Sequence, residues 1–495
     1  MKPNIFKLLF FTIAFFCTSN LFAQTITTNL DKLFASSLYP VNGNVLVAEK
    51  GRVIYQKSFG FADEKNKLVN NENSRFQLAS ITKTFTSTAI LQLKDKGKIN
   101  LEDTLVKYFP DFPYPEITIR HLLSHTSGLP DFQMFEEPVA KNREKIFTNS
   151  DIIPALKTWN KPLLFKAGEG WSYSNSGYCL LALLIEKLSG MKFEDYVQKQ
   201  IFVPAQMNNS YFETDLLKTT DAGTTKNQIY PTLYAKELQS VEMPKWRGFT
   251  GNGGIITTTG DMLKFDQALY SGKLLKQTTL DETFTPMKLI NGKNAKTGTL
   301  NSFYGLGWFI YEDESGGKIV WHGGGRPGIV TVFLRNITKG QTVIVFDNSF
   351  NRQTYRIGLA AINILNNTTF TFPAKSLVRD YGLTMVEKGI DGAFGKLLEL
   401  KSDVNYYLDG AEMAELAFQL LDDAKVTKHE DLALETAKLL TIYFPEDSNA
   451  FEAYGEILAQ TGKKDTAILM LKKSILLNPQ NNDAKNALVE LLNKK

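Results

Sequence analysis

Residues 76–86 read FQLASITKTFT and contain a Ser-x-x-Lys motif, Ser80 and Lys83, where a coil segment enters an amphipathic helix predicted to run to about Lys96. Residues three positions apart share a helix face, so the Lys83 amine can reach the Ser80 hydroxyl. Serine is a poor nucleophile until a base takes its proton, and a buried lysine can be that base. The stretch therefore predicts a nucleophile and its base at a helix N-terminus; the alternative is that Ser80 only caps the helix.

The Ser-x-x-Lys spacing occurs three times in the chain, so the surroundings of each copy must be compared. Ser189 ends a predicted helix, with Gly190 as its left-handed stop. Ser315 lies in an acidic, glycine-rich turn. Ser80 stands at the start of a long helix, where free backbone N–H groups and the helix dipole favour a developing oxyanion. These differences favour Ser80 as the nucleophile.

Two further motifs, each present once, carry complementary chemistry. Tyr173-Ser174-Asn175 offers a phenol that can relay a proton and an amide that can hold a substrate carbonyl; the alternative is a buried structural tyrosine. His322-Gly323-Gly324 lies on a predicted strand before a glycine-rich turn. Glycines there let a substrate lie along the strand edge, and the Gly325 N–H can complete an oxyanion hole. With Ser80, the motifs predict an acyl-transfer site.

The strand signals lie at the two ends of the first 370 residues. Runs at 44–50 and 52–58 form a predicted hairpin, and three more strands are expected at 318–322, 329–335 and 342–347. The region between them is rich in helix signals. This order predicts an α+β fold, an antiparallel sheet assembled from both ends and flanked by helices. The turns between the last three strands are expected at 323–328 and 337–341.

After about residue 370 the strand signals stop and helix formers dominate. A period of 34 residues relates Ala433 to Ala467 and Pro445 to Pro479, as in tetratricopeptide repeats. A last helix is expected at 484–492. We therefore predict an all-α helical-repeat domain at 371–495, which could bind a protein partner; the alternative is a plain helical bundle.

The first 23 residues are typical of a signal peptide, with Lys2 and Lys7 before an apolar run and Ala23 at the expected cleavage position. Residues 24–370 would then form the catalytic domain of a periplasmic or secreted protein. Cleavage would lower the formal charge from +4 to +2, which does not favour nucleic acid as a partner. We expect no membrane span after cleavage, and Cys179 as a buried residue rather than a second nucleophile.

The three motif segments, 76–86, 173–175 and 322–325, resemble those of the class C β-lactamase and penicillin-binding D-alanyl-D-alanine carboxypeptidase family. The resemblance covers roughly residues 25–365. It extends to three further blocks, at 119–128, 253–261 and 304–308.

The resemblance implies a role for each motif residue. Ser80 would be the acylated nucleophile, and Lys83 and Tyr173 would transfer protons. Asn175 would position the substrate, and the N–H groups of Ser80 and Gly325 would form the oxyanion hole. No cofactor is implied.

The third motif has His322 where β-lactamases of this family carry lysine. A Lys-Thr-Gly sequence does occur at 296–298, but it precedes the block at 304–308 and has no strand pattern, so Lys296 is expected on a surface loop. Histidine is often neutral at pH 7 and is then no fixed cation for a substrate carboxylate. The resemblance associates this variant with peptidases, D-amino-acid amidases and esterases. Arg326 could replace the cation or could simply be solvated.

Metal chemistry is not expected, because four histidines and no paired cysteines form no zinc pattern. His121 and His125 would share a helix face, but packing and capping roles are favoured for both.

Three functions are consistent with these observations. The first is a serine hydrolase acting on a small amide or ester, for example a D-amino-acid-containing peptide. The second is a β-lactamase proper, against which His322 argues. The third is a catalytically silent peptidoglycan-binding scaffold, which should have lost a motif residue, whereas Ser80, Lys83 and Tyr173 are all present.

Overall fold

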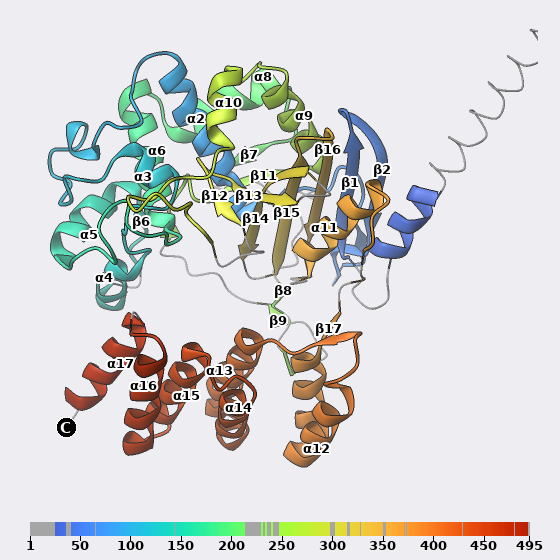
Figure 1. Ribbon diagram of the computed structural model, residues 1–495, viewed down its shortest axis with the longest axis vertical. Helices are drawn as coiled ribbons and strands as arrows, with labels where there is room; N and C mark the ends of the chain where they lie inside the picture. Colours follow the sequence, from blue (N-terminus) through green and yellow to red (C-terminus); the bar gives the residue numbers. More distant parts are fainter. Residues whose placement is uncertain are drawn as a thin grey trace, which may run out of the picture. The chain divides into compact units, whose positions relative to one another are not determined.

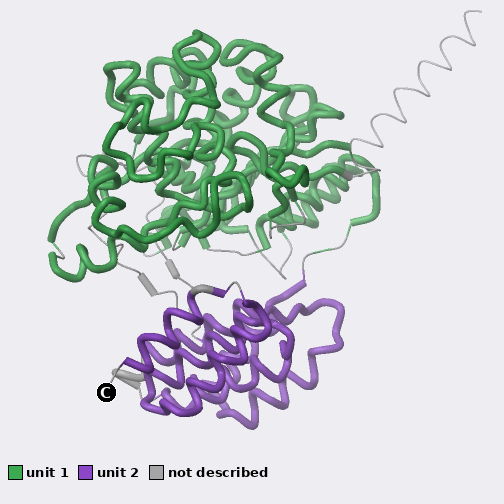
Figure 2. The backbone as a smooth tube through the Cα atoms, turned by 60° about the vertical axis from the view of Figure 1, so that its left-hand side comes forward, with its two compact units in different colours: residues 1–229, 240–372 green, residues 230–239, 373–495 purple. Residues whose placement is uncertain are grey.

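The chain forms two compact units, one made of residues 1–229 and 240–372 and the other of residues 230–239 and 373–495 (Figure 2). We call them the sheet unit and the helical unit. Residues 230–239 interrupt the sheet unit in sequence but belong to the helical unit. The computed structural model describes residues 25–35, 41–64, 66–142, 144–212, 229–230, 233–234, 239–240, 247–297, 302–313, 317–326, 328–349, 353–370, 372, 374–427, 429–479 and 481–493. The predicted signal peptide and Ser315 lie outside these residues.

The sheet unit is built on a seven-stranded sheet with the order β12-β13-β14-β15-β16-β1-β2, and all neighbouring strands are antiparallel (Figure 1). β1 pairs with β16, which joins the two ends of the unit. The predicted α+β fold is therefore confirmed. The strands span Gly43–Glu49 (β1), Arg52–Phe59 (β2), Phe303–Tyr304 (β12), Phe309–Asp313 (β13), Gly317–Arg326 (β14), Ile329–Asn336 (β15) and Gln341–Asp347 (β16).

Helices cover both faces of this sheet. Along β1, Val45 and Val47 face a core shared with the helix at 25–34 and with α11 (Thr354–Leu365), whereas Leu46 and Ala48 face the larger core on the other side. The alternation follows from the two-residue period of a strand. The larger core contains α2 (Thr82–Asp95), α6 (Asn175–Ser189) and α9 (Thr259–Tyr270).

The nucleophile motif lies at a junction of strand and helix. β5 (Phe76–Gln77) pairs with β11 (Ile255–Thr257), and a 3-10 turn at Ala79–Ile81 then leads into α2. Ala79 has a φ of +47°, in the left-handed region, which costs a residue with a Cβ about 1–2 kcal/mol. This strained turn presents Ser80 at the start of α2.

The glycines of the third motif are strand residues, so the predicted turn at 323–328 is wrong for residues 323–326. β14 continues to Arg326, and Gly323, Gly324 and Gly325 pair with residues of β15. A Cβ on Gly323 would overlap the Tyr355 ring, and one on Gly324 would overlap the Leu78 carbonyl oxygen. Close packing explains Gly323 and Gly324 better than a turn does.

The helix at α3 is shorter than expected. It ends at Leu123, and His125 follows it with a φ of +59°, so the predicted shared helix face of His121 and His125 is wrong. His121 instead takes part in a capping box with Thr118. Gly190 ends α6 with a φ of +69°, as expected.

Among its described residues, the helical unit contains six successive helices, α12 to α17 in Figure 1. They are α12 (Leu377–Leu400), α13 (Gly410–Thr427), α14 (Glu430–Tyr443), α15 (Ser448–Gln460), α16 (Lys464–Leu477) and α17 (Asn482–Asn493). From α12 onward each helix packs on the next. Ala433 on α14 and Ala467 on α16 are fully buried. Leu233 and Tyr234, from the segment within the sheet-unit sequence, are buried in the same core as α12 and α13.

Shorter elements complete the two units. They are β3 (Phe61–Asp63), β4 (Leu68–Val69), α3 (Ile119–Leu123), α4 (Glu136–Lys141), β6 (Phe147–Thr148), α5 (Ile152–Trp159), α7 (Phe193–Val197), α8 (Val203–Ala205), β7 (Tyr211–Phe212), β8 (Ile229–Tyr230), β9 (Gln239–Ser240), β10 (Arg247–Gly248), α10 (Gln277–Thr283), β17 (Lys375–Ser376) and β18 (Tyr406–Tyr407). Among the described residues, no helix combines the length and apolar character needed to span a bilayer.

Candidate active site

Lys83 is the centre of the site. Its side chain is fully buried, and its Nζ lies 3.1 Å from Ser80 Oγ, 2.7 Å from Asn175 Oδ1 and 2.9 Å from the Asn252 carbonyl oxygen. The amide and carbonyl oxygens can only accept hydrogen bonds. A neutral amine therefore donates its two hydrogens to Asn175 and Asn252 and turns its lone pair toward the Ser80 hydroxyl. This arrangement lets Lys83 take the Ser80 proton.

The charge state of Lys83 is suited to this task. Burial lowers its pKa to about 7, and the negative charge of Asp131 partly opposes that effect. A lysine in water would be protonated over the whole neutral range. Because its pKa is near 7, a large share of Lys83 is neutral at physiological pH.

Tyr173 joins Ser80 and Lys83. The Lys83 Nζ lies 4.7 Å from the centre of the Tyr173 ring, and the Ser80 hydroxyl interacts with the Tyr173 phenol, which opposes the rise in the tyrosine's pKa. Burial raises the pKa of Tyr173 well above its usual value, so the phenol keeps its proton. The structure thus brings together the three residues that the sequence predicts as catalytic.

The Tyr173 segment is held by His125. The two ring centres lie 4.3 Å apart; the Ser174 N–H donates to His125 Nδ1 at 3.1 Å, and the Ser172 N–H donates to the His125 carbonyl at 2.9 Å. Burial lowers the pKa of His125 well below its usual value, with the Lys83 and His322 charges acting in the same direction. A neutral ring that accepts at Nδ1 carries its hydrogen on Nε2. This atom has no hydrogen-bond partner among the described residues.

Asp131 was not predicted as part of the site. Its Oδ1 accepts from the Asn175 N–H at 2.6 Å and the Ser176 N–H at 3.3 Å, and its Oδ2 accepts from Asn175 Nδ2 at 3.0 Å. Asp131 stands three positions after the end of the block at 119–128. No local pattern links it to Asn175, 44 positions away, so the sequence carried no signal for the contact.

The His322 side chain is turned into the protein. It is 1% exposed; its Nδ1 donates to the Gly323 carbonyl at 2.7 Å, and its Nε2 lies 3.1 Å from the Tyr304 hydroxyl oxygen. Burial, helped by the Lys83 charge, lowers the pKa of His322 to about 3. The ring is therefore neutral, and both of its nitrogens are used.

The His322 side chain is buried, but among the described residues the backbone of β14 from His322 onward is left without a partner strand on one edge. β13 pairs only with Gly317–Trp321, so within the described residues the stretch His322–Arg326 has no strand on that edge. Gly325 is exposed, and a Cβ there would meet nothing within 4 Å. Arg326 is half-buried at the end of the strand. The open edge can receive an extended ligand backbone.

Lys296 lies elsewhere on the sheet unit. Its side chain is exposed, and its backbone forms a bridge with Phe303 at the start of β12. The prediction of a surface position for Lys296 is confirmed. Cys179 is buried, as expected.

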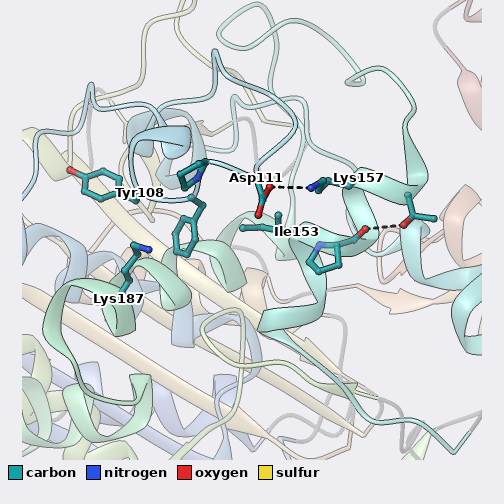
Figure 3. Close-up of a pocket in the computed structure, with 9 residues that line it drawn as sticks. Tyr108, Asp111, Ile153, Lys157 and Lys187 are labelled. Carbon is teal, nitrogen blue, oxygen red and sulfur yellow. Dashed lines mark hydrogen bonds and ion pairs between the residues drawn. The ribbon is translucent and has the colours of Figure 1, made fainter.

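A separate hollow of about 530 Å³ lies between the 108–111 turn and α5 (Figure 3). Phe109 and Ile153 line it, Lys157 pairs with Asp111 across it at 3.1 Å, and Lys187 comes from α6. Lys187 follows Asn175 by twelve helical residues, which is about 18 Å along the axis. The hollow is therefore distinct from the Ser80 site.

Comparisons with known proteins agree with this geometry. The beta-lactamase family model matches residues 35–365. Penicillin-binding protein 4* of Bacillus subtilis is 35% identical over 348 residues, which cover 68% of this chain and 74% of the relative. The structure of a penicillin-binding protein from Bacillus halodurans shares 28% identity with a TM-score of 0.56, covering 69% of this chain and 98% of that one.

A D-amino acid amidase structure from Ochrobactrum anthropi, 23% identical with a TM-score of 0.56, covers 70% of this chain and 99% of its own. At that identity it supports the fold alone. The family match and the Bacillus subtilis relative show the family as well as the fold, because they span most of the sheet unit. The chain therefore belongs to the beta-lactamase family and is a serine hydrolase of the penicillin-binding protein type.

Proposed function

We propose that the protein cleaves a small amide or ester through an acyl-enzyme on Ser80. Lys83 takes the Ser80 proton as Oγ bonds to the substrate carbonyl carbon. The oxyanion is held by the N–H groups of Ser80 and Gly325. Tyr173 gives its proton to the leaving nitrogen or oxygen as the scissile bond breaks, and regains a proton from Lys83. Water then hydrolyses the acyl ester by the same groups in reverse.

The observation that carries this proposal is the set of partners around Lys83. Two acceptor-only oxygens hold its amine, from Asn175 and Asn252, and the third neighbour is the Ser80 hydroxyl. Because a hydroxyl can donate as well as accept, the Ser80 contact serves Lys83 in both its protonated and its neutral form. The lowered pKa of Lys83, about 7, supports the same role.

The substrate we propose is a D-amino-acid-containing peptide or a related amide or ester. The penicillin-binding relatives support a peptide of this kind. The open edge at His322–Arg326 suits an extended chain whose backbone adds to β14. His322 is neutral and buried, so we propose that it supports the strand rather than binding a carboxylate itself. The remaining N–H of Asn175 Nδ2 would hold the substrate carbonyl.

The test is a substrate screen with purified protein. Peptides ending in D-Ala-D-Ala, D-amino acid amides, p-nitrophenyl esters and a chromogenic cephalosporin would be compared, with Ser80→Ala as the control. We expect turnover of peptides, amides or esters that Ser80→Ala abolishes. Rapid cephalosporin turnover would instead indicate a β-lactamase, and binding without any turnover would indicate a silent scaffold.

We also propose that the protein is exported and that the helical unit binds a protein partner. The N-terminal charge and apolar pattern supports export, and N-terminal sequencing of the periplasmic fraction would test it. The 34-residue period and the paired helices α13–α14 and α15–α16 support a repeat scaffold of the tetratricopeptide type.

A further inference from the structure

We propose that Asp131 is a positioning residue for acylation, which fixes the Asn175 side chain with its oxygen toward Lys83 and its nitrogen toward Asp131 itself. The inference rests on the proposed function of Ser80 and Lys83. It goes beyond that function because the chemistry itself gives Asp131 no part.

The contacts leave one orientation for the Asn175 amide. An amide side chain has an acceptor end and a donor end that are nearly equal in shape. Asp131 Oδ2, an acceptor, lies 3.0 Å from one end, and Lys83 Nζ, a donor, lies 2.7 Å from the other. Turning the amide over would place its nitrogen against the Lys83 amine and its oxygen against the Asp131 carboxylate. Both new contacts would be unfavourable. Asp131 therefore determines that the oxygen of the Asn175 amide, and not its nitrogen, contacts the Lys83 amine.

Asp131 is itself held in place. Its Oδ1 accepts from the backbone N–H groups of Asn175 and Ser176, at the first turn of α6, where a carboxylate is favoured by the helix dipole. The neighbouring Pro130 carbonyl accepts from the Ser176 hydroxyl at 2.6 Å. The segment that carries Asp131 is thus tied to the start of α6 at several points.

Asp131 also acts on Lys83 by its charge. Its carboxylate raises the pKa of Lys83, against the larger lowering effect of burial. Five other titratable groups act on Lys83 or lie over it, and burial keeps each of them neutral near pH 7. They are Tyr173, Tyr178, Cys179, His125 and His322. Among these described groups Asp131 is therefore the one whose charge can set the pH range in which Lys83 is a base.

The experiment measures how fast a fluorophosphonate probe labels Ser80 between pH 5 and 9, in the full-length mature protein. Wild type should show a rate that rises with pH and has a midpoint near 7. Asp131→Asn keeps the shape of the side chain but removes its charge and lets the Asn175 amide turn. Its midpoint should move down by about half a pH unit or more, and its plateau rate should fall about ten- to a hundredfold.

A matched control is Asp261→Asn. Asp261 is also buried and also holds a loop, since it accepts from the Asn209 N–H at 2.7 Å and the Ser210 hydroxyl at 2.9 Å, but it has no contact with Asn175 or Lys83. This variant can lose thermal stability, yet its labelling midpoint should equal that of wild type. A purely structural role for Asp131 predicts the same result for Asp131→Asn, and that result would overturn the proposal.

A second variant keeps the proposal testable if Asp131→Asn does not fold. The double variant Asp131→Asn/Asn175→Asp restores a pair of hydrogen bonds between the two positions and moves the negative charge next to Lys83. Its labelling midpoint should move above that of wild type. An unchanged midpoint would count against the proposal.

Failure of the proposed function would look different. If wild type is not labelled, or if Ser80→Ala is labelled equally well, the assignment of the nucleophile is wrong. If wild type behaves as expected and both Asp131 variants keep its midpoint, only the role of Asp131 is wrong.

Discussion

Gly324 of β14 lies so close to the carbonyl oxygen of Leu78 that a Cβ on the glycine would overlap it. The same oxygen accepts a hydrogen bond from Thr331 Oγ1 at 2.8 Å. Leu78 precedes the left-handed residue Ala79, and Ser80 follows at once. The turn that presents the nucleophile is therefore held by two contacts to the Leu78 carbonyl, the packing of the Gly324 backbone on β14 and the hydrogen bond from the Thr331 side chain on β15.

Replacing Gly324 should disturb this turn. We expect Gly324→Ala to lower the free energy of unfolding by about 1–3 kcal/mol, because a methyl group must be forced into a packed contact. Labelling of Ser80 should slow as well. Gly325→Ala adds the same group where nothing lies within 4 Å, so its melting temperature should stay near that of wild type. Equal melting temperatures for the two variants would show that the Leu78 contact is not tight.

The catalytic groups should act as one unit. Ser80→Ala should abolish turnover and covalent labelling. Lys83→Ala and Tyr173→Phe should each reduce kcat by several orders of magnitude, and the double variant should be little worse than the worse single one. Steady-state and single-turnover kinetics on the best substrate of the screen measure this. Losses that multiply in the double variant would indicate that the two residues act independently.

Activity should depend on pH through Lys83. Because burial lowers its pKa to about 7, the amine is increasingly protonated below that pH and cannot take the Ser80 proton. We expect kcat/KM to fall about tenfold per pH unit below 7 and to be level above it. The pKa of His322, about 3, lies outside this range. A midpoint near 10 would mean that Lys83 is not desolvated, and melting curves at each pH exclude unfolding as the cause.

The same burial should cost stability. The pKa of Lys83 is about 7 in the folded protein and about 10.4 in an unfolded chain, so the unfolded state binds the proton more tightly between these values. Stability should therefore rise with pH across this window. Lys83→Met should raise the melting temperature by several degrees at pH 7.5, and by less at pH 10.

Lys94 provides the control for that variant. It lies on the same helix but is partly exposed and pairs with Glu282 at 2.7 Å. Lys94→Met should not raise the melting temperature at either pH. A gain for Lys94→Met equal to that for Lys83→Met would mean that added apolar surface, rather than relief of a buried charge, stabilises the protein.

Removing residues 373–495 should leave a folded sheet unit with activity on small soluble substrates, because every site residue lies in that unit. The truncation also uncovers Leu233 and Tyr234, which the core of the helical unit otherwise buries. Solubility should fall, and the double change Leu233→Ser/Tyr234→Ser in the truncated protein should restore it. A tenfold or greater loss of small-substrate turnover, about 1.4 kcal/mol of barrier, would show that the helical unit supports catalysis.

Local pattern was sufficient for much of the fold. The nearly continuous apolar runs at 44–50 and 342–347 identify strands that are buried on both faces. A helix was also expected where α2 follows Ser80, although its residues 82–93 are buried all round rather than on one face. The three motifs were recognisable because each is short and contiguous. Val45 and Leu46 lie in different cores, as expected for neighbouring residues of a strand that is buried on both faces.

The sequence by itself determined the α+β class, the positions of the main strands and helices, and the candidate residues Ser80, Lys83 and Tyr173. Only the tertiary structure decided that Asp131 orients Asn175, that the His322 ring faces inward, and that residues 230–239 belong to the helical unit. The reason is physical. Periodicity reports which face of an element is buried, whereas a hydrogen bond between residues 44 positions apart, or a close approach of two backbones, depends on how distant segments pack.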